Sequence, residues 1–117
     1  MTLENNRYLL SGGVNPLKLA EKYSCPLYVY DSAIMERQYK RMEQAFEVPK
    51  MKINYACKAL SNISVLKLFR SFGSGLDTVS VQEVELGLKA GFDPQDIIYT
   101  PNCVSIEEIE EAVEHGV

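Results

Sequence analysis

Three strand–helix units follow one another between residues 51 and 115, and this repeat limits what the chain can fold into. The predicted strands cover 51–57, 76–79 and 96–100, and the predicted helices cover 62–72, 80–91 and 105–115. The units recur about every twenty residues, as expected when strands alternate with helices. Parallel neighbours need a crossover connection, and such crossovers are right-handed, so the repeat predicts an α/β fold with a parallel sheet. An open doubly wound sheet and a closed barrel both remain compatible with the pattern.

Local signals define the ends of the later helices. Ser80 and Ser105 each stand three residues before a glutamate, which is the pattern of a capping box at a helix start. Gly91 and Gly116 follow the last periodic residues, where a left-handed residue commonly ends a helix. These signals support the second and third units independently of their apolar spacing.

Two helices and a strand are predicted before the first unit. They cover 16–23, 26–30 and 32–46, with the strand lying between the two helices. Asn15 and Asp31 are the expected N-caps, and Pro49 is expected to end the second helix. We therefore expect residues 1–31 to form an N-terminal segment that contains a strand.

The length of the chain bears on the choice of fold. At 117 residues it has the size of one small domain, whereas an eightfold barrel needs about 250 residues. Three units alone would leave two bare sheet edges. We expect either that the chain is the N-terminal part of a longer protein or that something covers these edges.

Composition excludes several classes of function. The formal net charge of −4 provides no basic surface for nucleic acid, and no apolar run is long enough to cross a membrane. The N-terminus lacks the features of a signal peptide, and three widely spaced cysteines suit a reducing cytoplasm. The single histidine, His115, makes a Ser/His/Asp triad or a histidine-rich metal site unexpected, and no metal is predicted.

The first strand of the repeat ends on a lysine. Met51, Ile53, Tyr55 and Cys57 fall on one face of this strand, while Lys52, Asn54, Ala56 and Lys58 fall on the other. Parallel α/β folds place their chemistry at the carboxyl ends of the strands. An amine held among apolar walls loses preference for its charged form, becomes nucleophilic and can form a Schiff base. The alternative is a strand-end lysine that simply extends into solvent.

Two carboxylates follow in the second unit. Asp77 lies in the strand next to that of Lys58, and a buried carboxylate requires a cation, either Lys58 or a bound cationic ring. A solvated or capping aspartate at a strand end is the alternative. Glu83 holds the glutamate position of the Ser80 capping box, which explains it without a ligand, although a second role near the strand ends stays open.

Several motifs resemble one enzyme class. The runs Tyr55-Ala56-Cys57-Lys58-Ala59 and Gly73-Ser74-Gly75-Leu76-Asp77-Thr78-Val79-Ser80 resemble the alanine-racemase-like class of pyridoxal-phosphate (PLP) enzymes. The nearest likeness is to the branch of diaminopimelate, ornithine and arginine decarboxylases. Residues 26–31, 90–92 and 97–102 are also similar to that branch, so the resemblance covers most of the chain from about residue 15. Cys25 departs from the threonine that is common at its position.

The resemblance implies roles for four residues. Lys58 matches the lysine that carries PLP as a Schiff base. Asp77 and Glu83 match acidic residues near the cofactor, and Ala56 matches a small residue beside it. The phosphate-binding loop and the ring-stacking histidine of the family would lie beyond Val117, and His115 does not match that histidine.

The resemblance also implies a fold and an activity. The family has an N-terminal (β/α)8 barrel and a C-terminal β domain and is usually a homodimer. Residues 32–117 would then be the first part of the barrel, and the strand in residues 1–31 would belong with the β domain. The implied reaction is decarboxylation of meso-2,6-diaminopimelate, a small-molecule substrate, to L-lysine. An ornithine or arginine decarboxylase, or a barrel segment without turnover, stays open as an alternative.

Overall fold

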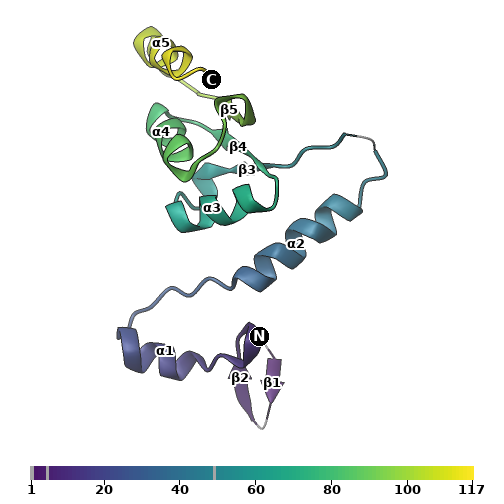
Figure 1. The fold of residues 1–117 in the computed structure, drawn as a ribbon. Helices are drawn as coiled ribbons and strands as arrows, with labels where there is room; N and C mark the ends of the chain where they lie inside the picture. The colour runs from purple at the N-terminus through teal and green to yellow at the C-terminus, as the bar shows by residue number, and fades with distance from the viewer. Residues whose placement is uncertain (1, 5, 49) are drawn as a thin grey trace. The chain divides into compact units, whose positions relative to one another are not determined.

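The computed structural model describes residues 2–4, 6–48 and 50–117, which divide into two compact units, Met1–Ala45 and Phe46–Val117. Figure 1 shows the elements of each unit. Within the described residues, no helix combines the length and the apolar composition that a membrane crossing requires.

The first unit contains a small hairpin and two helices. In chain order its elements are β1 (Thr2–Glu4), β2 (Arg7–Leu9), the 3-10 turn η1 (Ser11–Gly13), α1 (Pro16–Tyr23) and α2 (Ser32–Gln44). The two strands pair antiparallel, with Leu3 opposite Tyr8. The sequence did not predict this hairpin.

Both predicted N-caps of this unit are confirmed. The side chain of Asn15 accepts a hydrogen bond from the backbone N–H of Leu17 at 2.9 Å. Asp31 accepts from the N–H groups of Ala33 and Ile34, and also from the N–H of Ser11 at 2.9 Å. These bonds, that from Ser11 foremost, hold the pKa of Asp31 below its usual value. The carboxylate therefore joins the start of α2 to the turn after the hairpin.

The predicted strand over residues 26–30 is wrong for the described chain. These residues form no strand, and Tyr28 is 87% exposed. The β-branched and aromatic composition favours an extended chain, but a strand also needs a neighbour for its backbone groups, and no described segment pairs with this one. The helix α2 ends at Gln44 rather than Phe46, and Pro49 lies outside the described residues.

The second unit contains the predicted repeat. Its elements are β3 (Asn54–Ala56), the 3-10 turn η2 (Cys57–Ala59), α3 (Ile63–Ser71), β4 (Gly75–Thr78), α4 (Val81–Ala90), the 3-10 turn η3 (Pro94–Asp96), β5 (Ile97–Tyr99) and α5 (Ile106–Glu114). The strands are parallel in the order β3-β4-β5, so the predicted parallel α/β sheet is confirmed. Consecutive strands that are also spatial neighbours place successive crossovers on one face, as in a barrel wall.

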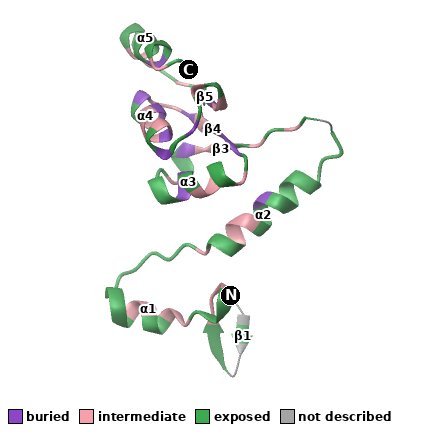
Figure 2. Cartoon of the chain, in the orientation of Figure 1, coloured by how far each residue is buried: buried purple, intermediate pink, exposed green. Residues whose placement is uncertain are grey.

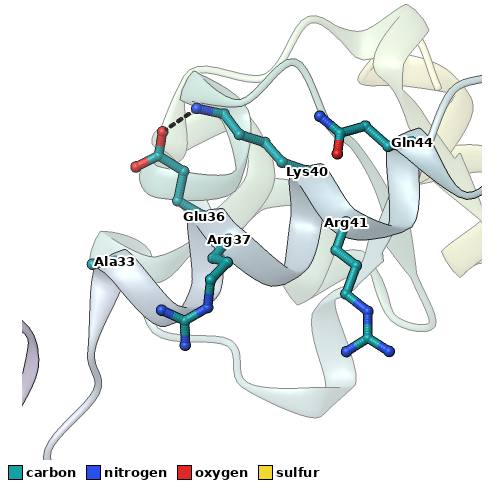
Figure 3. Close-up of a pocket in the computed structure, with 6 residues that line it drawn as sticks. All are labelled: Ala33, Glu36, Arg37, Lys40, Arg41 and Gln44. Atoms are coloured by element: carbon teal, nitrogen blue, oxygen red, sulfur yellow. Dashed lines mark hydrogen bonds and ion pairs between the residues drawn. The ribbon is translucent and has the colours of Figure 1, made fainter. Parts of the chain in front are cut away.

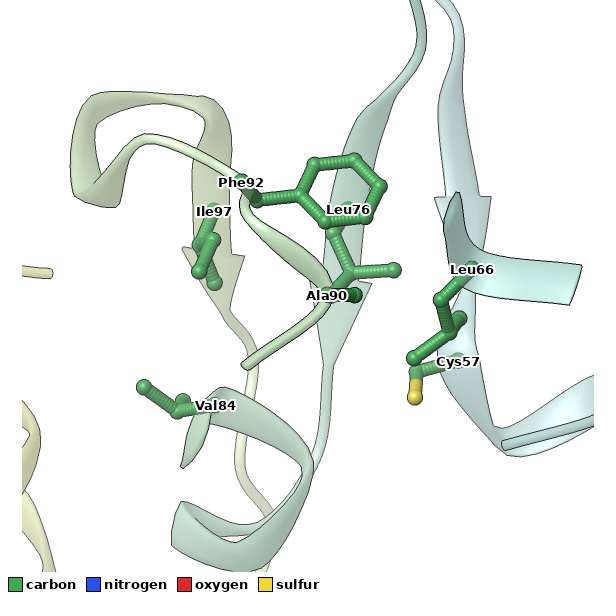
Figure 4. Packing of buried hydrophobic residues seen from close by; sticks show 7 residues of the cluster. All are labelled: Cys57, Leu66, Leu76, Val84, Ala90, Phe92 and Ile97. Atoms are coloured by element: carbon green, nitrogen blue, oxygen red, sulfur yellow. The ribbon is translucent and has the colours of Figure 1, made fainter. Parts of the chain in front are cut away.

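The register gives the sheet two distinct faces. Tyr55, Leu76 and Ile97 lie side by side on one face, and Ala56, Asp77 and Ile98 lie side by side on the other. The first face carries a core cluster of Cys57, Leu66, Leu76, Val84, Ala90, Phe92 and Ile97 (Figure 4). These residues are buried or nearly so, and the buried positions of the second unit gather around β4 and α4 (Figure 2).

Two helices cover the apolar face at short range. In α3, Leu66 is fully buried and Phe69 stacks on Tyr55 with ring centroids 4.0 Å apart. In α4, a Cβ on Gly87 would lie 2.5 Å from Cδ2 of Leu76, so glycine allows the helix to approach the sheet closely. Apolar residues of both helices therefore pack into this core.

The helix caps of the second unit follow the sequence signals. Ser105 and Glu108 form a complete capping box at the start of α5. Gly91 ends α4 with a φ of 92°, a left-handed conformation that glycine adopts without steric cost. The predicted strand over 51–57 is shorter in the structure, because the 3-10 turn begins at Cys57.

Replacing Leu66 with alanine should destabilise the second unit by about 2–5 kcal/mol, because the substitution removes a fully buried side chain and leaves a cavity. Urea unfolding of the chain measures this change. Lys67→Ala, at the exposed neighbouring position in α3, is the matched control and should change the unfolding free energy by less than about 0.5 kcal/mol. Equal losses in the two variants would contradict the proposed core.

Candidate active site

The candidate site lies where the three parallel strands end. Lys58 belongs to the turn η2 directly after β3, Asp77 is the third residue of β4, and Glu83 lies in the first turn of α4. Ala56 is the register partner of Asp77. Because the carboxyl ends of parallel strands meet at one edge of the sheet, these positions share that edge.

The side chain of Lys58 is exposed. The turn η2 buries Cys57 completely and leaves the next residue in solvent. Among the described residues the Lys58 ammonium has no ion pair. The apolar walls expected around this lysine are thus not formed by the described chain. An accessible amine without a competing carboxylate is nevertheless what Schiff-base formation requires.

Asp77 is partly buried and has a specific partner. Its Oδ1 accepts a hydrogen bond from the hydroxyl of Thr100 at 2.7 Å. Within the described residues no cation pairs with this carboxylate, so the predicted contact with Lys58 is not formed. The sequence analysis missed Thr100; the signal was its position at the end of the third predicted strand.

The Glu83 side chain caps the start of α4. Its backbone N–H donates to the hydroxyl of Ser80 at 3.2 Å, and its Oε2 accepts from the N–H of Val79 at 2.9 Å. The carboxylate thus reaches one residue beyond the N-cap, rather than the Ser80 N–H that a standard capping box uses. Capping accounts for its position, and the partly buried side chain stays close to the strand ends.

The charge of Glu83 also affects the core thiol beside Lys58. Burial raises the pKa of Cys57 to about 11, and the negative charge of Glu83 adds to this shift. The thiol therefore stays protonated at neutral pH and serves as a small apolar group.

Two other surface features lie apart from the strand ends. A hollow of about 350 Å³ runs along α2, lined by Ala33, Glu36, Arg37, Lys40, Arg41 and Gln44 (Figure 3). Its Lys40–Glu36 ion pair, 2.6 Å long, raises the pKa of Lys40. On α4 and at the end of α5, the possible metal-ligand atoms of Glu85, Glu111 and His115 lie within 4.8 Å of one another. Glu85 is ion-paired with Lys89. Neither feature contains a residue of the strand-end site.

The class of protein follows from a family match. The family described as "Pyridoxal-dependent decarboxylase, pyridoxal binding domain" matches residues 32–117, which is most of the chain. The chain belongs to this family, and its cofactor is pyridoxal 5′-phosphate. The sequence is also similar to individual enzymes of this family.

Diaminopimelate decarboxylases are the relatives that the chain resembles in sequence. That of Methanothermobacter thermautotrophicus is 41% identical over 112 residues, and that of Bacillus subtilis is 40% identical over 112 residues. Each alignment covers 94% of this chain and 26% of the relative. The chain therefore spans about a quarter of the length of these relatives.

Solved structures of diaminopimelate decarboxylases share the fold. The enzyme of M. jannaschii, in complex with L-lysine, matches with a TM-score of 0.90 at 30% identity, covering 99% of this chain and 28% of that one. The enzyme of Helicobacter pylori, also complexed with L-lysine, matches with a TM-score of 0.81 at 35% identity, over 88% of this chain and 26% of that one. The expected barrel-domain fold is thus confirmed for the segment that this chain represents.

The strand-end residues fit the cofactor of the family. The exposed Lys58 amine is free of ion pairs in the described chain, and small Ala56 leaves room on the same sheet face. Asp77 supplies a carboxylate on the neighbouring strand. An amine and a nearby carboxylate suit a cofactor that carries an aldehyde and a basic ring.

At pH 8, alkylation of Cys57 by iodoacetamide should be at least roughly tenfold slower than alkylation of Cys25 and Cys103, because only the thiolate reacts and Cys57 is buried and protonated. Peptide mass mapping over time measures the three rates. In urea the three rates should become similar. Rapid labelling of Cys57 in the folded chain would contradict its place in the core.

Proposed function

We propose that this chain is the lysine-bearing part of a PLP-dependent amino-acid decarboxylase that converts meso-2,6-diaminopimelate to L-lysine. The observation that carries the proposal is the free Lys58 amine at the end of β3, on the strand beside that of Asp77. Support for the substrate comes from the relatives named diaminopimelate decarboxylase at 41% and 40% identity.

Each residue of the site has a distinct part in this proposal. Lys58 would hold the cofactor through its amine, which is the nucleophilic group of this edge. Asp77 supplies negative charge at this edge and would orient Lys58 in the enclosed enzyme, although the two side chains make no ion pair in the described chain. Ala56 leaves space beside the amine, and Glu83 lines the same edge while it caps α4.

The bound cofactor supplies an electron sink for the carbanion left when carbon dioxide departs. The chain contributes orientation and fixed charge, which act most strongly where water is excluded. The described residues leave Lys58 exposed, so we infer that other parts of the enzyme enclose it.

The domain organisation forms part of the proposal. We place residues 1–31 as an N-terminal segment associated with the β domain of the full enzyme, and residues 32–117 as the first part of its barrel. The start of the family match at residue 32 supports this boundary. The compact units themselves divide later, between Ala45 and Phe46. We further propose a cytoplasmic homodimer: the three free cysteines support a reducing compartment, and the homodimer rests on the family resemblance alone.

An ornithine-type activity has weaker support. A lysine/ornithine decarboxylase of Vibrio vulnificus, complexed with cadaverine, matches with a TM-score of 0.79 at 25% identity, over 86% of this chain and 27% of that one. That identity is below the 30% and 35% of the solved diaminopimelate decarboxylases.

Incubation of the chain with PLP followed by borohydride reduction should place a pyridoxyl group on Lys58 in preference to other exposed lysines, because its accessible amine follows β3 at the strand-end edge that also carries Asp77. Peptide mass mapping locates the label, and Lys58→Ala should abolish it. Lys52→Ala is the matched control, since that lysine precedes the same strand and is ion-paired with Asp96. Labels spread evenly over the lysines, or none, would count against a built site.

The longer enzyme that contains this chain should release carbon dioxide from meso-diaminopimelate in preference to ornithine and arginine. Competition among the three substrates, with kcat/KM as the measure, tests this selectivity. A higher kcat/KM for ornithine or arginine would favour the alternative activity. Absence of release with all three, despite a labelled Lys58, would show that the proposed reaction is wrong.

A further inference from the structure

The hydroxyl of Thr100 is fixed beside the Asp77 carboxylate by the end of the sheet. Thr78 pairs with Tyr99 in the register of β4 and β5, and the N–H of Thr100 then donates to the carbonyl of Thr78 at 2.8 Å. The parallel ladder thus continues one residue beyond β5. This bond anchors the backbone of Thr100 against β4.

The side chain of Thr100 lies on the same face as Asp77. Asp77 pairs with Ile98, and side chains two residues apart on an extended chain point the same way. The Thr100 hydroxyl approaches Asp77 Oδ1 at 2.7 Å and the carbonyl oxygen of Thr78 at 3.3 Å. A hydroxyl has one hydrogen to donate, and the shorter contact to a charged acceptor is the stronger one.

The orientation of Asp77 therefore depends on this bond. No other described side chain donates a hydrogen bond to the carboxylate, and no described cation pairs with it. Thr100 is β-branched, which restricts its χ1, although its side chain is exposed. We propose that Thr100 is a positioning residue, which holds the Asp77 carboxylate in the orientation that serves Lys58. This inference rests on the proposed function, because it assumes that Asp77 acts on the lysine.

The explanation that competes with a positioning role is a purely structural role for Thr100. Its hydroxyl also lies near the Thr78 carbonyl, and its N–H extends the hydrogen-bond ladder of the sheet. Such a part would alter stability without depending on Asp77. Thr100→Val removes the hydroxyl while keeping the shape and the N–H, and Thr100→Ser keeps the hydroxyl. The two variants separate the hydroxyl from the backbone contact.

The test is a double-mutant cycle on the rate of pyridoxyl labelling at Lys58, after PLP and borohydride treatment of the chain. Thr100→Val should slow labelling roughly fivefold, the scale of one lost hydrogen bond, and Thr100→Ser should restore the rate to within about twofold. In an Asp77→Ala background, which removes the acceptor, Thr100→Val should have no further effect, because the two residues act as one unit. Urea unfolding of the same variants reports any general loss of stability.

The outcomes separate this inference from the proposed function. Unchanged labelling in Thr100→Val, or an equal loss in the Asp77→Ala background, would overturn the positioning role while leaving Lys58 as the cofactor lysine. An unlabelled Lys58 in the unaltered chain would overturn the proposed function. In that case NMR χ1 couplings of Asp77 test the contact between Thr100 and Asp77. We expect a single Asp77 rotamer in the unaltered chain and averaged rotamers in Thr100→Val. Averaged rotamers in both chains would refute the positioning role.

Discussion

The parallel register of β3, β4 and β5 is the constraint on which the rest of the second unit depends. Ala56, Asp77 and Ile98 are neighbours because each strand pairs at one particular offset with the next. A slip of one residue would turn Asp77 into the core and Leu76 toward the opposite face. The register therefore decides both what is buried and which side chains meet at the strand ends.

The two faces of this sheet are specialised in different ways. The face with Tyr55, Leu76 and Ile97 packs against apolar residues of α3 and α4. The opposite face presents Ala56, Asp77 and the exposed Ile98, and its strand ends carry the residues proposed for chemistry. Because the lysine is exposed and the packing residues point the other way, chemistry and stability rest on different side chains.

Glu83 and Thr100 show how backbone geometry places charge near Lys58. Glu83 accepts a hydrogen bond from the N–H of Val79 at the start of α4, and its charge contributes to the raised pKa of Cys57. Thr100 continues the ladder of β5 and donates its hydroxyl to Asp77. In both cases a contact at the end of a helix or strand also holds a polar side chain at the candidate site.

The sequence by itself determined the strand–helix repeat, the helix caps and the alternation that separates Cys57 from Lys58, because these depend on residues a few positions apart. It also indicated Lys58 and Asp77 as neighbours through the order of the strands. Only the tertiary structure decided that residues 26–30 form no strand, that β1 and β2 form a hairpin, and that Asp77 bonds to Thr100 rather than Lys58. Those outcomes depend on which backbone or side-chain partner lies within hydrogen-bond distance, and local propensity does not specify a partner that is distant in the chain.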